Sequence, residues 1–160
     1  NNVNQPTAPL EIQSAPALQL LHICKMPAVD VSNAPGVLEL MLEDTRILDF
    51  TMFPLLRKLI VSMSTRNNVD AVVVQNMTCL TSIQLKNFAN VRIVNNQNIV
   101  QLILDDTEVQ EITNTPNLTL LNLFNKATIP QNSINLDKID RRVIGGMTPS
   151  SYYKVVITHT

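Results

Sequence analysis

The chain has 160 residues, of which 45% are apolar and 16% are charged, and its formal net charge is −1. This near-neutral balance does not suggest the basic surface that nucleic-acid binding requires, and no apolar run is long enough to predict a membrane-spanning helix. The length suits a single domain with a buried core.

The first segment, 1–9, is polar and contains Pro6 and Pro9, and we interpret it as an N-terminal linker or cap. Its composition is not that of a signal peptide. Two origins fit it equally: a linker left after removal of a signal peptide, or an arbitrary boundary of the sequence.

From residue 10 onward an apolar pattern repeats, mostly every 19 residues. Each repeat has an apolar phase position, a second apolar position three residues later and a third two residues after that. One step, from Leu56 to Leu80, is longer and places five additional residues within 62–68. The eighteen apolar positions are Leu18, Leu21, Ile23, Val37, Leu40, Leu42, Leu56, Leu59, Val61, Leu80, Ile83, Leu85, Ile99, Leu102, Leu104, Leu118, Leu121 and Leu123.

Each repeat has a second apolar pair, eleven and thirteen residues after the phase position when the insertion is allowed for. Ten of these twelve positions are apolar, and Gln110 and Gln131 are the exceptions. Leu10 and Ile12 hold the same places half a repeat earlier. Because alternation with a period of two is typical of strands, each repeat is predicted to contain two short strands. Prolines such as Pro35 fall between the strands and favour corners.

These elements predict a mainly β fold with little or no helix, namely a right-handed β-solenoid of about six turns over residues 10–131. Stacked turns pair their strands in parallel, at a spacing of about 4.8 Å. After residue 131 the pattern is lost. Since an open solenoid end exposes core and unpaired backbone, we expect 132–160 to form a C-terminal cap with a strand at 152–158.

Segments 37–45 (VLELMLEDT) and 99–107 (IVQLILDDT) resemble the L-x-x-L-x-L core of leucine-rich repeats. Segment 29–37 (VDVSNAPGV) is similar to the L-D-L-S-N-x-P-x-L part of short bacterial leucine-rich repeats, which have about 19–21 residues per turn. The asparagine usual three residues after L-x-L is replaced here by Thr45, Thr107, Met26 and Phe88. The resemblance covers about residues 10–131 and implies a protein-interaction role with no shared catalytic residues.

The residues between the inward leucines should point out of the solenoid, and several of them are apolar. The central outward row is His22, Met41, Ile60, Gln84, Ile103 and Asn122. An apolar patch on a face that should be solvated favours an interaction surface for a protein partner. Two alternatives stay open: the tail or a neighbouring domain covers this face, or parallel sheets simply favour Ile and Val on both faces. The predicted binding residues are Met41, Ile60, Ile103, His22, Gln84, Glu39 and Lys58.

Glu11, Asp30 and Asp49 fall at the middle of the second strand in successive turns. Stacked carboxylates can bind a cation or form an acid/base pair for a sugar substrate. A solvated stripe that discourages stray pairing is favoured, because like charges on adjacent strands would otherwise need a compensating ion. The carboxylates keep open a carbohydrate-binding or carbohydrate-active β-helix as an alternative, beside a structural self-assembling spacer.

The sequence offers little for catalysis. Its two histidines are His22 and His159, and only His22 has a nucleophile nearby, Cys24, with no orienting acid apparent. Cys24 and Cys79 fall two turns apart at different repeat positions, so they are expected to be free. We therefore expect a non-enzymatic protein with no cofactor and no metal site.

Together these features predict a non-enzymatic protein-binding module for adhesion or recognition. We expect it to act outside the cell or at the cell surface, with a cytoplasmic location as the alternative, and without membrane insertion. Asn76-Met77-Thr78 and Asn117-Leu118-Thr119 match the N-glycosylation acceptor pattern. They do not establish secretion, because a chain with 18 asparagines is expected to contain such matches by chance.

Overall fold

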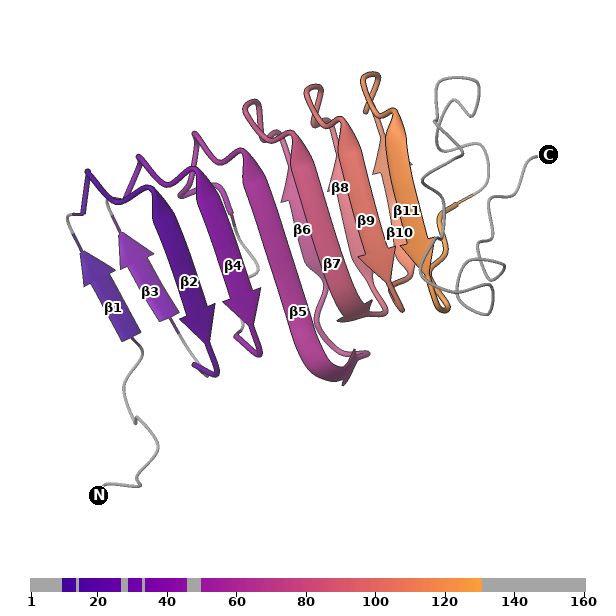
Figure 1. Cartoon of the computed structure of the whole chain (residues 1–160), viewed down its shortest axis with the longest axis horizontal. Helices are drawn as coiled ribbons and strands as arrows, with labels where there is room; N and C mark the ends of the chain where they lie inside the picture. The colour runs from indigo at the N-terminus through magenta and orange to yellow at the C-terminus, as the bar shows by residue number, and fades with distance from the viewer. Residues whose placement is uncertain (1–9, 14, 27–28, 33, 46–49, 131–160) are drawn as a thin grey trace.

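The computed structural model describes residues 10–13, 15–26, 29–32, 34–45 and 50–130, and every regular element in these ranges is a β-strand. The N-terminal segment 1–9 and the predicted cap 132–160, with its strand at 152–158, lie outside the described residues. All strand pairing is parallel, so the described chain forms the predicted β-solenoid (Figure 1). The strands are β1 (Leu10–Gln13), β2 (Leu20–Cys24), β3 (Val29–Ser32), β4 (Glu39–Glu43), β5 (Lys58–Asn67), β6 (Val72–Gln75), β7 (Ser82–Phe88), β8 (Val91–Val94), β9 (Gln101–Asp105), β10 (Val109–Thr113) and β11 (Leu120–Phe124).

The main sheet collects the first strand of each turn in the order β11-β9-β7-β5-β4-β2. Its register follows the sequence period, since Leu21 pairs with Leu40, and Leu40 with Leu59. The same row continues through Ile83 and Leu102 to Leu121. All these side chains are buried, as are the corresponding residues two positions later, so the predicted inward positions of this sheet are confirmed.

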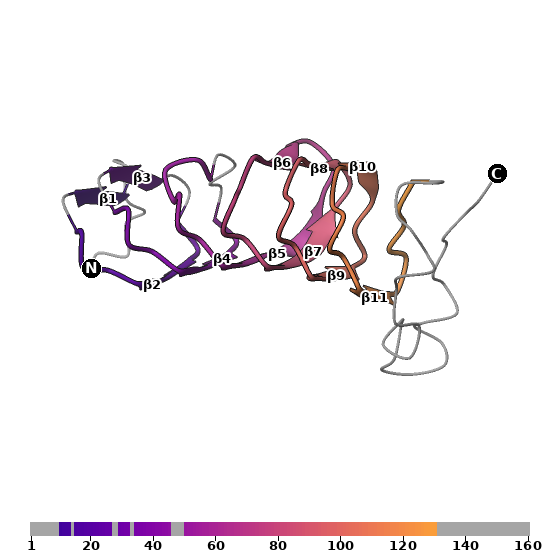
Figure 2. The same ribbon diagram turned by 90° about the horizontal axis from the view of Figure 1, so that it is seen from above.

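The second layer consists of the pair β1-β3 and the three-stranded sheet β10-β8-β6. Figure 2 shows this layer facing the main sheet across the interior of the solenoid. Val72, Val91 and Val109 point inward at equivalent places and are buried. The apparent exception Gln110 is explained by a β-bulge: Val109 lies opposite Val91, and Gln110 is the exposed extra residue.

Most corners are built around left-handed backbone. Among the described residues, eight non-glycine residues have positive φ, and seven of them are Asn or Asp, the two types that adopt this conformation most readily after glycine. This backbone requirement accounts for five of the 18 asparagines of the sequence. The eight residues are Lys25, Asp44, Asn76, Asn87, Asn95, Asp106, Asn114 and Asn125.

Three buried polar residues satisfy backbone groups at the corners. The Thr45 hydroxyl accepts a hydrogen bond from the Met26 N–H at 3.2 Å, and Thr107 accepts one from the Phe88 N–H at 3.4 Å. These four positions are the ones at which the sequence departs from the leucine-rich-repeat asparagine. At the opposite corner Asn96, which is fully buried, accepts from the Met77 N–H and donates to the Val74 carbonyl, both at 2.9 Å.

The five-residue insertion lengthens β5 and the loop after it. The register between β5 and β7 shifts between Ser62 and Asn67, which pair with Lys86 and Phe88. Between these two pairs β5 advances by five residues and β7 by only two, so three of the five inserted residues lie in this part of β5. The other two fall between Asn67 and Val72, so the insertion extends beyond the predicted range of 62–68.

Candidate binding surface

The structure brings all seven predicted binding residues onto the outer face of the main sheet. The central outward row runs from His22 to Met41, Ile60, Gln84, Ile103 and Asn122, each paired with the next across the sheet. Met41, Ile60 and Ile103 are half-buried by their neighbours. Gln84 lies between Ile60 and Ile103, so the apolar strip has an interruption.

Two further rows flank the central one. On one side Leu20, Glu39 and Lys58 pair in sequence at the starts of β2, β4 and β5, and Leu20 is 61% exposed. A cavity of about 250 Å³ opens beside them, lined by Gln19, Leu20, Leu38, Glu39 and Arg57. This end of the face therefore combines exposed apolar surface with charges of both signs.

A contact that the sequence did not suggest joins the central row to the other flanking row, which contains Cys24 and Glu43. The His22 Nε2 atom lies 2.5 Å from the Glu43 carboxylate, and both side chains are about half exposed. Glu43 is also the register partner of Cys24. The orienting acid missing from the linear sequence thus comes from the next turn, 19 residues after Cys24. The described hydrogen bonds include none between the Cys24 thiol and the His22 ring, and Cys24 and Cys79 are both free, as expected.

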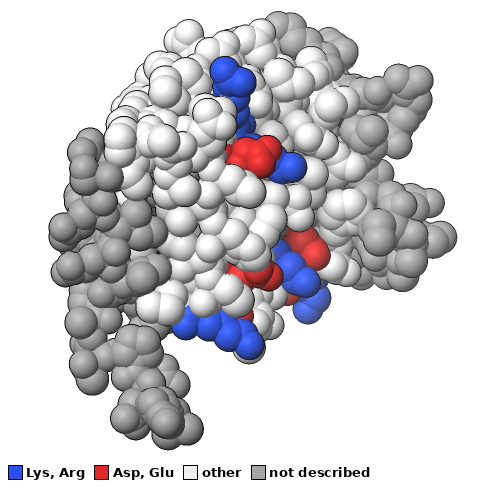
Figure 3. Space-filling model, turned by 60° about the vertical axis from the view of Figure 1, so that its left-hand side comes forward, with Lys and Arg blue, Asp and Glu red and all other residues white. Residues whose placement is uncertain are grey.

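The charges over the described surface are few and mixed. Figure 3, with the β1 and β2 end of the solenoid turned toward the viewer, shows mostly uncharged atoms and small groups in which basic and acidic side chains touch. No single-sign field extends over this view, so it offers neither a polyanion nor a strongly basic partner a matching surface.

The three acidic residues predicted to align in the second layer, which we call the acidic column, are only partly covered by the described residues. Glu11 and Asp30 are register partners in β1 and β3, while Asp49 lies outside the described residues. Farther along the same column Arg92 forms an ion pair with Glu111. Among the described residues no group of three or more His, Cys, Asp and Glu side chains is arranged to hold a metal ion.

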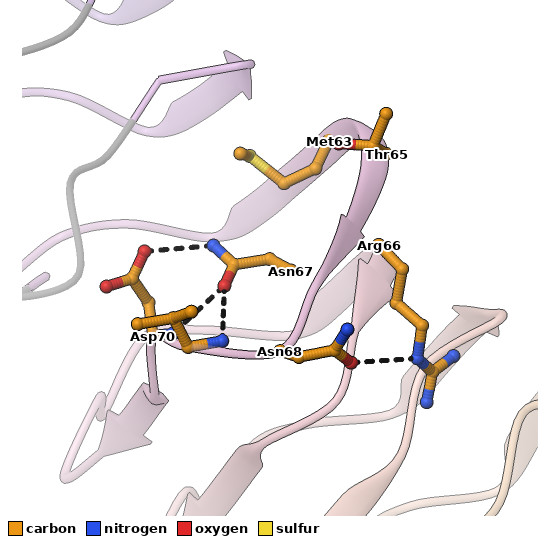
Figure 4. A pocket seen from close by; sticks show the side chains of 7 residues that line it. Met63, Thr65, Arg66, Asn67, Asn68 and Asp70 are labelled. Atoms are coloured by element: carbon orange, nitrogen blue, oxygen red, sulfur yellow. Dashed lines mark hydrogen bonds between the residues drawn. The ribbon is translucent and has the colours of Figure 1, made fainter.

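The insertion forms a second, ordered feature at one corner of the solenoid. It surrounds a cavity of about 390 Å³ whose lining is drawn in Figure 4. The Asn67 side-chain oxygen accepts hydrogen bonds from the backbone N–H groups of Val69 and Asp70, both at 2.9 Å. This turn holds Val69 at the tip, where it is 86% exposed.

Arg66 ties the insertion to a corner two turns farther along. Its guanidinium donates to the backbone and side-chain oxygens of Asp106, at 2.9 and 2.7 Å, and forms an ion pair with Glu108. These groups are about one quarter to one half exposed. The partners lie 40 and 42 residues away, so nothing local in the sequence predicts them.

Asp44 ties the base of the insertion to the end of β4. The Ser64 hydroxyl and the Ser64 backbone N–H both donate to its carboxylate, at 2.5 and 2.6 Å. These hydrogen bonds favour the charged carboxylate and hold the pKa of Asp44 below its ordinary value, with a smaller contribution from Lys25.

Comparisons of the chain with protein-family models, with curated proteins and with solved structures give no match. The described residues include no helix that is long and apolar enough to cross a bilayer.

Proposed function

We propose that this chain is a non-enzymatic recognition or adhesion module, similar to leucine-rich-repeat proteins, whose outer sheet face binds a protein partner. The observation that supports the proposal best is the contiguity of Met41 and Ile60, which are register partners on that face. As part of the same proposal, the module acts outside the cell or at the cell surface.

The face has the composition of a protein interface. Register partners lie about 4.8 Å apart, so Met41 and Ile60 form one apolar strip, and Glu39 and Lys58 pair beside it. An apolar centre with a polar rim is the usual anatomy of such interfaces. Leu20, at the end of the flanking row, adds apolar surface that a partner can cover.

A charge at the centre of this strip should abolish binding. Ile60→Asp removes apolar contact area and places a carboxylate that a partner would have to desolvate without a matching charge. Central interface residues of this kind cost more than about 2 kcal/mol when altered, which is more than about thirtyfold in affinity. Because Ile60 is only half-buried, the solenoid should tolerate the change.

The test is affinity capture with the wild type and with an Ile60→Asp/Ile103→Asp variant, from lysate and surface extract of the source organism and its host. The control is Val69→Asp, which introduces one such carboxylate at an exposed apolar residue outside the face. Circular dichroism and thermal melts establish that all three are folded. The dissociation constant of each captured protein is then measured with purified components.

A protein captured by the wild type and by Val69→Asp, and bound at least about thirtyfold more weakly by the double variant, would support the proposal. Equal capture by all three folded proteins would contradict it and direct attention to the other surfaces. Concentration-dependent oligomers in size-exclusion chromatography, disrupted by the double variant, would instead favour the self-assembling spacer.

A further inference from the structure

A second surface stands out at the solenoid edge formed by the loops from β6 to β7, β8 to β9 and β10 to β11, which lie side by side at the top of Figure 1. We call residues 75–81, 94–100 and 113–119 the amide edge. These ranges contain no charged residue. Their exposed side chains are mostly amides and hydroxyls: Gln75, Asn76, Thr78, Thr81, Asn95, Gln97, Asn98, Thr113, Asn114 and Asn117.

Three of these amides are joined in a row along the solenoid. The Asn95 side chain donates to the Asn76 side-chain oxygen at 2.6 Å, and the Asn114 side chain donates to that of Asn95 at 2.5 Å. All three residues are exposed. An amide has two N–H donors and an oxygen with two lone pairs, so each residue keeps hydrogen-bonding capacity for a ligand while the row fixes its orientation.

A second row of amides runs beside the first. Asn98 donates to the Thr78 carbonyl at 2.5 Å, and Asn117 donates to the Gln97 carbonyl at 2.7 Å, each reaching back to the preceding turn. Both residues are exposed. Five oriented amides therefore stand in two parallel rows, and the repeat spaces those within a row at about 4.8 Å.

The left-handed backbone does not by itself explain this composition. The opposite edge of the solenoid has the same positive φ at five described corners, and there the residues include Lys25, Asp44 and Asp106. On the amide edge all three such positions are asparagine. The neutral side chains thus go beyond what the corner geometry requires.

We propose that the amide edge binds a neutral polysaccharide. Oriented amides that both donate and accept hydrogen bonds complement sugar hydroxyl groups, which also do both. Val100, which is 39% exposed, adds apolar surface for the carbon face of a sugar ring. An acidic polysaccharide or a nucleic acid would find no basic residue within this edge. The site is separate from the outer sheet face, so the two proposals stand or fall independently.

The test is affinity gel electrophoresis in gels that contain a neutral β-glucan, a neutral galactomannan or the acidic polysaccharide alginate. The protein is produced in a host without N-glycosylation, because Asn76 and Asn117 lie in Asn-x-Thr patterns. The main variant is Asn76→Gly/Asn95→Gly/Asn114→Gly, since glycine keeps the left-handed corners without strain. The matched control is Asn125→Gly, at a left-handed position of the opposite edge.

We expect a neutral polysaccharide to retard the wild type and the control, with alginate leaving both unaffected. Each amide removed should weaken binding by about fivefold, the effect of one ordinary hydrogen bond, so the triple variant should lose nearly all retardation. Should that variant fail to fold, Asn98→Ala/Asn117→Ala, which leaves the corners unchanged, carries the same expectation. Absence of retardation of the wild type, or equal retardation of the wild type and the folded variants, would overturn the proposal.

Discussion

Replacement of Asn96 by leucine should destabilise the solenoid strongly although the two residues are similar in size. Asn96 is fully buried, and its side chain bonds the Met77 N–H and the Val74 carbonyl at 2.9 Å. A buried N–H left without an acceptor costs about 1–3 kcal/mol, and the lost donation to the carbonyl adds about 0.5–1.5 kcal/mol. The expected total is roughly 1.5–4.5 kcal/mol, which corresponds to a fall of about 3–18 °C in melting temperature for a chain of this size.

The matched control is Asn98→Leu, two residues farther on, where the asparagine is exposed and makes one hydrogen bond to a carbonyl. That variant should lose less than about 1.5 kcal/mol. Thermal melts followed by circular dichroism compare the two, and hydrogen exchange should show faster exchange of the Met77 amide in Asn96→Leu. If both variants melt within about 1 °C of the wild type, with Met77 still protected, the buried hydrogen bonds do not contribute as argued.

Three further changes test other parts of the structure. Arg66→Met should speed hydrogen exchange of residues 63–71 while lowering stability by no more than about 1 kcal/mol, because its ion pairs are partly exposed; unchanged exchange there would contradict the link. The carboxylate of Asp44 has its pKa lowered by Ser64, so its contribution to stability is present above the unfolded value and is lost as pH falls through the folded one. An NMR titration of Ser64→Ala should show that pKa rising toward 3.8, and an unchanged value would refute this cause. Gly36→Ala should lower the melting temperature, because the added Cβ would lie 2.7 Å from the Pro16 carbonyl oxygen; equal melts would show that the backbone there moves freely.

Much of the fold follows from the period alone. Because parallel strands in stacked turns place equivalent residues side by side, the 19-residue spacing was enough to predict that Leu21, Leu40 and Leu59 form one inward row. The same reasoning placed Met41 beside Ile60 on the outside. The predicted binding residues therefore share one face, while their binding of a partner stays a prediction.

Some features were present in the sequence but could be interpreted only with the structure. Gln110 looked like a break in the apolar column, whereas a bulge moves it outward and brings Val109 inward. The period also pairs Cys24 with Glu43, 19 residues later, yet the hydrogen bond between that carboxylate and the His22 ring depends on side-chain geometry.

The amino-acid sequence by itself determined the repeat length, the inward rows and the residues that share the outer face, because these depend only on periodicity and on parallel stacking. Only the tertiary structure decided the path of the insertion, the contact of Arg66 with Asp106 and the hydrogen-bonded row of Asn76, Asn95 and Asn114. Such contacts depend on where corners bring side chains in space. The Arg66 side chain reaches Asp106, 40 residues later in the sequence, because the solenoid stacks the turns that carry them.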